Sequence, residues 1–182
     1  MTLQATTTNV IYEWAEPEKL NKNGIQLSKQ LTQETRWAKV HTAGIESILE
    51  PGDDILLSAR PVSYHFEFDN KELHNTADAS VMAFKRDGQL RATCGTIIYE
   101  WIEEKEKVSE GGIILIQKDA NKELEPKWAL VVACGPTSGV NVGDNVLLAF
   151  KSDAYTLKID GRTLHNAGKE EVIAFTSFSI NT

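Results

Sequence analysis

The sequence predicts an all-β protein made of two tandem domains, each of them a small β-sandwich or β-barrel. Three observations lead to this prediction. The chain repeats itself once, apolar residues alternate with polar ones over short runs, and turn-forming residues recur between those runs. Alternation with a period of two is the pattern of a half-buried strand, and turn signals at intervals of roughly eight to twelve residues are typical of small all-β domains.

An internal repeat organises the whole chain. The tripeptide Leu-His-Asn occurs at residues 73–75 and again at residues 164–166, which is 91 positions later in a chain of 182 residues. The same register aligns tryptophans, Gly-Asp turns and apolar runs of the two halves. The openings of the two copies, residues 10–14 and 97–101, match at a spacing of 87. The second copy has therefore gained four residues between its opening and its next tryptophan.

The size of the repeat sets the number of domains. A unit of about ninety residues is too long for a solenoid repeat and fits one small domain. We therefore predict a first domain at residues 1–91 and a second domain at residues 92–182, with the boundary between Asp87 and Gly95.

Local patterns predict individual strands. In residues 64–68 aromatic side chains alternate with polar ones, and residues 155–159 alternate in the same phase. Two short apolar runs bounded by glycines, residues 129–133 and 146–150, predict strands that are buried on both faces.

Turns are predicted between these strands wherever Gly, Asp and Asn cluster, at residues 51–53, 69–70, 142–144 and 160–161. Residues 26–39 carry leucines at helical spacing. Their counterpart contains Pro126, which disfavours a helix, so we predict a loop in both copies.

The composition predicts a soluble, folded protein with 41% apolar and 25% charged residues. No apolar run is long enough to span a membrane. The N-terminal residues lack the basic start and apolar stretch of a signal peptide. The net charge of −7, with no Lys/Arg cluster to offset it, argues against nucleic acid as a partner. Two cysteines at unrelated repeat positions, Cys94 and Cys134, predict no disulfide framework and favour a reducing, cytoplasmic location.

The repeated histidines are candidates for either a functional site or a structural role. His74 and His165 each follow an acidic turn by a few residues, and each precedes an asparagine, Asn75 or Asn166. An imidazole in such a place most often bonds to turn backbone, and asparagine tolerates a positive φ. We therefore predict that these four residues form structural turns.

No pattern for reaction chemistry is present. The sequence contains no CxxC, HxH or HExxH spacing for a metal, and no GxSxG, phosphate-loop or GxGxxG motif. We therefore predict no catalytic residue, no metal site and no cofactor, and we expect that the protein is not an enzyme.

Each copy carries a long charged segment between its opening strand and its tryptophan strand, at residues 15–27 and 103–115. Both segments become apolar after glycine. In the first copy Gly24 precedes Ile25 and Leu27, and the second copy reads Gly111, Gly112, Ile113, Ile114, Leu115. Loops of this length in a compact unit are usually either functional or mobile. Three consecutive aliphatic residues cannot all face inward from a loop, so these residues form the candidate binding site.

The order of these features resembles the GroES co-chaperonin family. The resemblance rests on the opening strand, the glycine-aliphatic loop tip, a strand ending at Gly135, the Val-Gly-Asp turn at residues 142–144, the Lys-Ile-Asp hairpin at residues 158–160 and the closing apolar strand at residues 171–175. It covers the second copy nearly end to end, and the first copy through the repeat. It implies that each copy is an irregular Greek-key β-barrel. It also implies that the barrels form a ring and that the loops dock into the apical domain of a chaperonin and cap its folding chamber.

Departures from that pattern refine the expectation. The short link at residues 135–139 leaves no room for the hairpin that roofs the bacterial ring. In lacking this hairpin the chain is similar to bacteriophage co-chaperonins. In the first loop the middle tip residue is Gln26, so this loop loses an aliphatic contact worth roughly 1.5–3 kcal/mol. Two barrels per chain require an even number of barrels in a closed ring, and we expect a homo-oligomer, either a trimer or a tetramer.

A second class of function stays open. The chain could be a phage virion structural protein, a capsid-decorating or connector subunit that reuses the same barrel. Its partners would then be capsid or neighbouring virion proteins instead of a chaperonin. The expected location is the host cytoplasm if the protein is phage-encoded, or the virion under this alternative.

Overall fold

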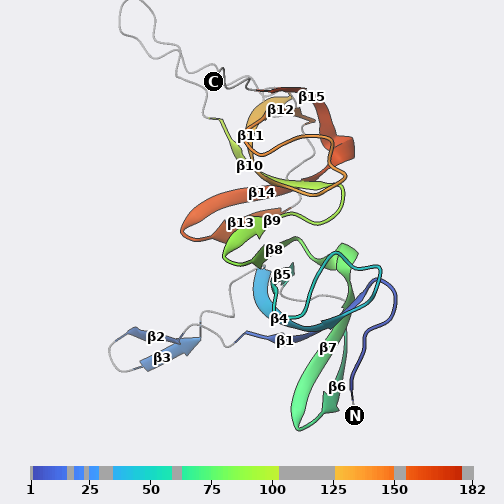
Figure 1. Cartoon of the computed structure of the whole chain (residues 1–182). Coiled ribbons are helices and arrows are strands. Elements are labelled where there is room, and N and C mark those ends of the chain that lie inside the picture. The colour runs from blue at the N-terminus through green and yellow to red at the C-terminus, as the bar shows by residue number, and fades with distance from the viewer. Residues whose placement is uncertain are drawn as a thin grey trace, which may run out of the picture. The chain divides into compact units, whose positions relative to one another are not determined.

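The computed structural model describes residues 2–15, 19–22, 25–28, 35–58, 63–102, 126–149 and 155–177, with the backbone alone for residues 19–22, 25–28 and 155. The chain divides into two compact units, Met1–Cys94 and Gly95–Thr182, and each unit has its own sheet and its own core (Figure 1). All strand pairs in the described ranges are antiparallel, and these ranges contain no α-helix. The predicted all-β fold class is confirmed.

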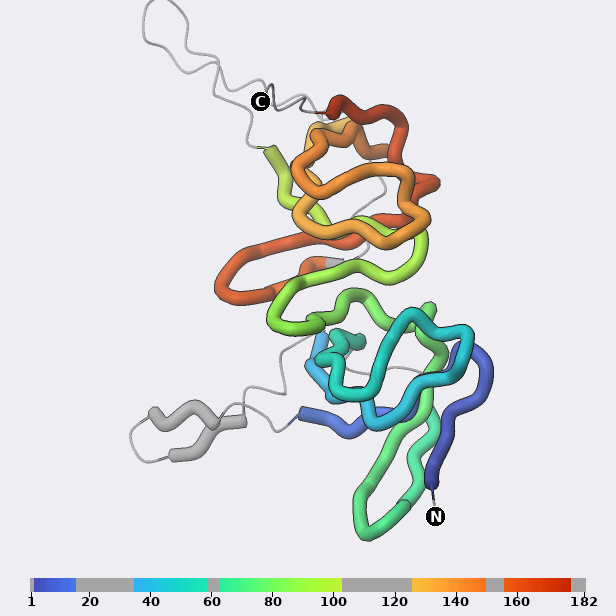
Figure 2. Tube along the Cα trace, viewed as in Figure 1, coloured from blue at the N-terminus to red at the C-terminus, as the bar shows by residue number. Residues whose placement is uncertain are grey.

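A seven-stranded sheet forms the first unit, in the order β6-β7-β1-β4-β5-β8-β9. Its strands are β1 (Asn9–Trp14), β4 (Thr35–Ala43), β5 (Asp54–Ser58), β6 (Tyr64–Phe68), β7 (Lys71–Ala77), β8 (Ala83–Arg86) and β9 (Gln89–Arg91). A 3-10 turn, Asp78–Ser80, joins β7 to β8. Strands β1, β4 and β5 lie side by side in the sheet in the same order as along the chain. Strand β7 returns to pair with the other edge of β1 (Figure 2). This arrangement is a Greek key.

A six-stranded sheet forms the second unit, in the order β13-β14-β10-β11-β12-β15. Its strands are β10 (Thr96–Trp101), β11 (Lys127–Cys134), β12 (Asn145–Leu148), β13 (Tyr155–Ile159), β14 (Arg162–Gly168) and β15 (Val172–Thr176), with a 3-10 turn at Lys169–Glu171. The order matches that of the first unit strand by strand, with β10 in the place of β1 and β15 in the place of β8. Strand β9 has no counterpart among the described residues of the second unit.

The two sheets also share a local irregularity. Strand β1 shifts its register against β4 between Ile11 and Tyr12, and β10 shifts against β11 between Ile98 and Tyr99. A bulge of this kind bends a strand and increases its twist. The same bend therefore occurs at the same place in both units.

Three hairpins close with two-residue turns, at residues 69–70, 87–88 and 160–161. Both residues of each turn have positive φ, between 49° and 79°. Tight turns that match the strand twist need this conformation, which Asp, Asn and Gly adopt more readily than other residues. The turns predicted at residues 69–70 and 160–161 are confirmed.

Each unit encloses its own apolar core. In the first unit it comprises Val10, Tyr12, Ala38, Val40, Leu49, Ile55, Leu57, Val81 and Phe84, and in the second Ile97, Tyr99, Ala129, Val131, Val140, Val146, Leu148 and Ala167. The strand expected at residues 129–133 to be buried on both faces is half-buried instead. Along β11 buried residues alternate with more exposed ones, and Leu130 is 38% exposed. Strand β12 also alternates, because only one face of this sheet packs on the core.

The loop predicted at residues 26–39 needs a correction as well. A separate two-stranded sheet pairs β2 (Lys19–Lys22) with β3 (Ile25–Ser28), and β4 already begins at Thr35. Pro126 lies just before β11, where its missing N–H removes no ladder hydrogen bond.

Candidate functional site

Both candidate docking loops leave their units from equivalent stems. The first loop connects β1 with β4, and the amide of Ala15 donates a hydrogen bond of 3.1 Å to the carbonyl of Trp37. The second loop connects β10 with β11, and the amide of Ile102 donates a bond of 3.1 Å to the carbonyl of Trp128. The same backbone bond therefore closes both stems.

The structure describes the predicted loop tips only in part. Ile25 and Leu27 lie on β3, where their backbone faces Lys22 and Leu20 of β2. The first loop thus contains a hairpin that the sequence did not predict. Gly24 and the whole second tip, Gly111, Gly112, Ile113, Ile114 and Leu115, lie outside the described residues.

An arginine reinforces the stem of the first loop. The guanidinium carbon of Arg36 lies 4.5 Å from the ring centroid of Trp14, and Nη2 donates a hydrogen bond of 3.1 Å to the carbonyl of Ala15. Cation–π contacts of this kind contribute about 0.5–1 kcal/mol at exposed sites. The second copy has Lys127 at this position. A lysine lacks the planar guanidinium group that can stack on an aromatic ring and donate a hydrogen bond at the same time.

An aromatic cluster lies beside the stem of the first unit. His74 of β7 stacks on Tyr12 of β1, with ring centroids 5.5 Å apart and an interplanar angle of 21°. Trp14 meets Tyr12 edge-on at 5.1 Å and His74 at 5.7 Å. Tyr12 and His74 are direct cross-strand partners in the sheet, so the ladder itself brings these rings together.

The same cluster recurs in the second unit. His165 stacks on Tyr99 with centroids 5.4 Å apart, and Trp101 lies 4.9 Å from Tyr99. Tyr99 and His165 are again cross-strand partners. The Leu-His-Asn motif therefore recurs together with the Tyr and Trp of the opening strand because the three rings form one packing unit.

This arrangement corrects the predicted turn role of the motif. His74 and Asn75 lie inside β7, and His165 and Asn166 lie inside β14. Neither asparagine has a positive φ, because the preceding two-residue turns already reverse the chain. The signal for the true role was present in the sequence, since Tyr and Trp recur with the histidines.

Burial is the main influence on the imidazole of His74. It lowers the pKa of His74, while the carboxylate of Glu72, 3.6 Å from Nε2, acts in the opposite direction. Electrostatic interactions with His65 and Arg36 lower the pKa of His74 further. Within the described ranges no group of three or more His, Cys, Asp or Glu side chains is arranged to hold a metal ion.

Sequence reasoning missed a buried ion pair in the first unit. Arg86 of β8 donates to both carboxylate oxygens of Asp53, at 2.9 and 2.7 Å, and also to Glu50 and to the carbonyl of Ile48. Asp53 is 3% exposed. Burial alone raises the pKa of Asp53, but the hydrogen bonds from Arg86 and from the Glu50 amide outweigh it, and the pKa is lowered.

The second unit builds the equivalent turn differently. Asp144 is buried and accepts a hydrogen bond of 2.8 Å from the amide of Asn141. At the repeat position of Arg86 the chain has Ser177. This difference between the copies is the signal by which the sequence could have singled out Arg86.

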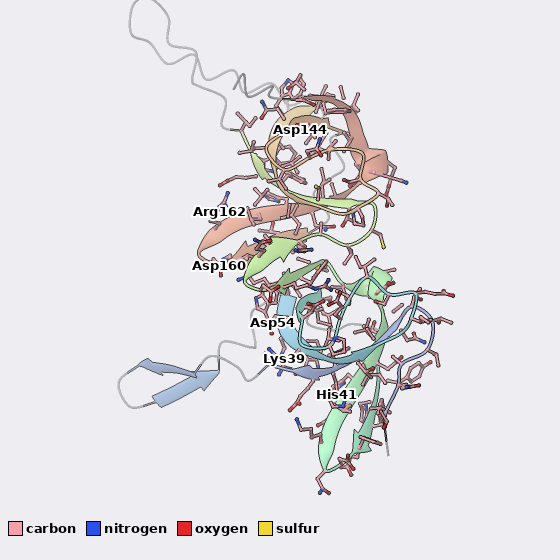
Figure 3. All side chains as sticks on the ribbon, viewed as in Figure 1. Lys39, His41, Asp54, Asp144, Asp160 and Arg162 are labelled. Atoms are coloured by element: carbon pink, nitrogen blue, oxygen red, sulfur yellow. The ribbon has the colours of Figure 1, made fainter. Side chains whose placement is uncertain are left out.

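Exposed ion pairs cross the sheets elsewhere. Figure 3 shows Lys39 of β4 next to Asp54 of β5, where Nζ lies 3.1 Å from Oδ1. Arg162, labelled in the same figure, pairs with Glu100, as Lys71 pairs with Glu13 in the first unit. Such exposed pairs contribute little to stability.

Comparison with known proteins relates the second unit to a known family. Residues 90–176 match the family model of the chaperonin 10 Kd subunit. This family consists of co-chaperonins and not of enzymes, and the match supports a co-chaperonin-like function. No curated protein matches the chain. None of the helices among the described residues is long and apolar enough to cross a membrane.

Proposed function

We propose that the chain is a tandem duplication of the chaperonin 10 unit and serves as a subunit of a co-chaperonin ring. The observation that carries this proposal is the family match of residues 90–176, together with the equivalent loop stems of the two units. Shared strand order, a shared bulge and a shared aromatic cluster support the duplication.

In this proposal the loops are the docking elements. The tip of the second loop, Gly111, Gly112, Ile113, Ile114 and Leu115, inserts its aliphatic side chains into an apolar groove of the chaperonin apical domain. Each buried aliphatic side chain contributes roughly 1.5–3 kcal/mol to the free energy of binding. The entropy lost when a chain segment becomes ordered on binding offsets part of this contribution. Several loops on one ring then bind together with high avidity.

The first loop, with Gly24, Ile25 and Leu27, is the weaker ligand. Its central tip residue, Gln26, is polar and loses hydrogen bonds to water when it enters an apolar groove. We assign the main docking role to the second loop.

The test is a chaperonin pull-down with the full chain carrying Ile114→Asp. We expect loss of binding with an unchanged melting temperature, because the substitution places a charge in the groove. The matched control is Val142→Asp, since Val142 is an exposed aliphatic residue of the same unit (63% exposed) outside the loop. It should bind as the wild type does.

Unchanged binding by the Ile114→Asp variant would exclude the second loop as the ligand. A wild-type protein that binds no chaperonin would contradict the co-chaperonin proposal itself. In that case the protein should be sought by mass spectrometry in purified phage particles, as the alternative of a virion subunit requires.

A further inference from the structure

A block of histidine and glutamate side chains occupies one face of the hairpin that β6 and β7 form in the first unit (Figure 1). His65 of β6 is the direct cross-strand partner of His74 of β7, and Glu67 is the partner of Glu72. Residues two apart on a strand point to the same face, and directly opposed residues of a strand pair share a face. These four residues, called the His-Glu block below, therefore lie together.

The second unit shows that the fold does not require this block. It has the same hairpin in the same register, with Thr156 opposite His165 and Lys158 opposite Thr163. Only one histidine of the block is repeated there. His74 and His165 both stack on a tyrosine, so packing explains their recurrence. The other three residues of the block occur in the first copy alone and need a separate explanation.

The two glutamates of the block carry an electrostatic cost. Glu67 and Glu72 face each other directly across the strand pair. Like charges in directly opposed positions destabilise such a pair. A cation bound on the same face offsets this repulsion. The second unit avoids the cost, since its residues at these two positions are Lys158 and Thr163.

One carboxylate and one imidazole of the block are separated as two ligands of one metal ion are. Oε1 of Glu72 lies 3.6 Å from Nε2 of His74, which is too long for a hydrogen bond. Zinc binds imidazole nitrogen and carboxylate oxygen at about 2.0–2.2 Å, so two such ligands at a tetrahedral angle lie roughly 3.3–3.6 Å apart. A zinc ion therefore fits between these two atoms.

The second imidazole lies within reach of the same ion. The ring centroids of His65 and His74 are 6.2 Å apart, with an interplanar angle of 45°. Two imidazoles bound to one zinc ion have centroids roughly 5–6 Å apart. Three such side chains do not yet converge on one point in the described part of the chain. A turn of the exposed His65 ring about its side-chain bonds closes the remaining distance.

We propose that His65, Glu72 and His74 bind one zinc ion, with Glu67 as an outer carboxylate and water in the fourth position. Imidazole ligands suit zinc, whereas magnesium and calcium prefer oxygen ligands. Burial lowers the pKa of His74 and so favours the neutral imidazole, which is the form that binds a metal. The ion ties the edge strand β6 to β7.

This site differs from the absence of a metal site that the sequence patterns predict. Those patterns recognise ligands that are close together in the sequence. His65 and His74 belong to different strands and become neighbours only because the hairpin pairs them. The inference goes beyond the proposed co-chaperonin function and does not depend on it.

The test is isothermal titration calorimetry of the full chain with zinc chloride. Cys94 and Cys134 are first replaced by serine, because thiolates also bind zinc. We expect this cysteine-free protein to bind one zinc ion per chain, and magnesium chloride to produce no heat of binding. His65→Ala and Glu72→Gln should each weaken zinc binding at least about tenfold, since even the loss of an outer partner lowers metal affinity by that factor.

The matched control is His41→Ala, which removes an exposed histidine of the same unit outside the block. It should bind zinc as the cysteine-free protein does. Melting curves give a second readout, because a ligand that binds only the folded state raises the melting temperature. Zinc should raise it in the cysteine-free protein and in His41→Ala but not in His65→Ala. Without zinc the three proteins should melt alike.

The second unit allows the site to be built anew. Thr156→His and Thr163→Glu together place the same three ligand types around His165, in the register that the first unit has. The folded double variant should bind a second zinc ion per chain.

Three outcomes would overturn the inference. They are a cysteine-free protein that binds no zinc, equal losses of affinity in His65→Ala and His41→Ala, and a folded double variant that binds no second ion. None of them bears on docking, which the Ile114→Asp pull-down tests separately.

Discussion

At the scale of residues, the pairs Tyr12–His74 and Tyr99–His165 have the same stacked geometry in the two units. Each pair joins neighbouring strands of one sheet. Ring pairs of this kind contribute about 0.5–1.5 kcal/mol beyond the area that they bury. The histidines therefore stabilise the place where each loop stem meets the sheet.

The substitution His165→Ala removes one of these stacks. It should lower the free energy of unfolding of the second unit by about 1 kcal/mol and the melting temperature by a few degrees. Calorimetry or circular dichroism measures the change. His41→Ala is the control, because His41 is exposed at the bulge of β4 and should leave the transition unchanged. Chaperonin binding that disappears at full stability would instead show a direct role for His165.

The lowered pKa of His74 predicts a dependence of stability on pH. In the unfolded chain the imidazole takes up a proton around its ordinary pKa of 6.5, whereas in the folded protein it does so only at lower pH. The contribution of His74 to the stability of the folded protein is therefore fully present above pH 6.5. It is lost as the pH falls through the pKa that His74 has in the folded protein.

The variant His74→Phe keeps a stacking ring and cannot be protonated. Its stability should fall less than that of the wild type when the pH is lowered from 7 through this window. Denaturant unfolding measured at several pH values decides this, and parallel curves for the two proteins would contradict the prediction.

At the scale of elements, β8 is tied to the turn before β5 by Arg86. The bidentate bond to Asp53 keeps a buried carboxylate charged, and further bonds to Glu50 and Ile48 hold the turn in place. Breaking a buried pair leaves an uncompensated charge, which is far more costly than losing an exposed pair.

The substitution Arg86→Met should therefore destabilise the first unit by about 3 kcal/mol. Lys39→Met is the matched control, because the Lys39–Asp54 pair is exposed on both sides and should cost at most about 1 kcal/mol. Denaturant unfolding of the two variants gives the comparison. If the two variants lost the same free energy of unfolding, the charge of Asp53 would be stabilised by the turn backbone alone and not by Arg86.

At the scale of the whole molecule, the number of units per chain limits the symmetry of any ring. If every chain contributes two barrels to one closed ring, the ring contains an even number of barrels. A ring of seven barrels cannot be built from this chain alone. Six or eight barrels correspond to three or four chains.

Native mass spectrometry of the isolated protein tests this limit. We expect a trimer or a tetramer, which places six or eight barrels in one closed ring of cyclic symmetry. Dilution to nanomolar concentration should yield monomers. A stable monomer at micromolar concentration would contradict the ring and favour a subunit that assembles only on another structure.

The sequence by itself determined the features that depend on neighbouring residues. Alternating side chains predicted β6, and Asp, Asn and Gly predicted the tight turns, because strand and turn geometry is set within a few residues. The repeat showed that two similar stretches follow each other, and the order of motifs indicated the family that residues 90–176 match.

Only the tertiary structure decided which distant residues meet. The stacking of His74 on Tyr12, the bond of Arg86 to Asp53 and the pairing of β9 with β8 depend on strand order, which no local pattern encodes. For the same reason β11 was wrongly expected to be buried on both faces. An apolar run shows that a strand is stable, but its outer face is buried only if another layer covers it.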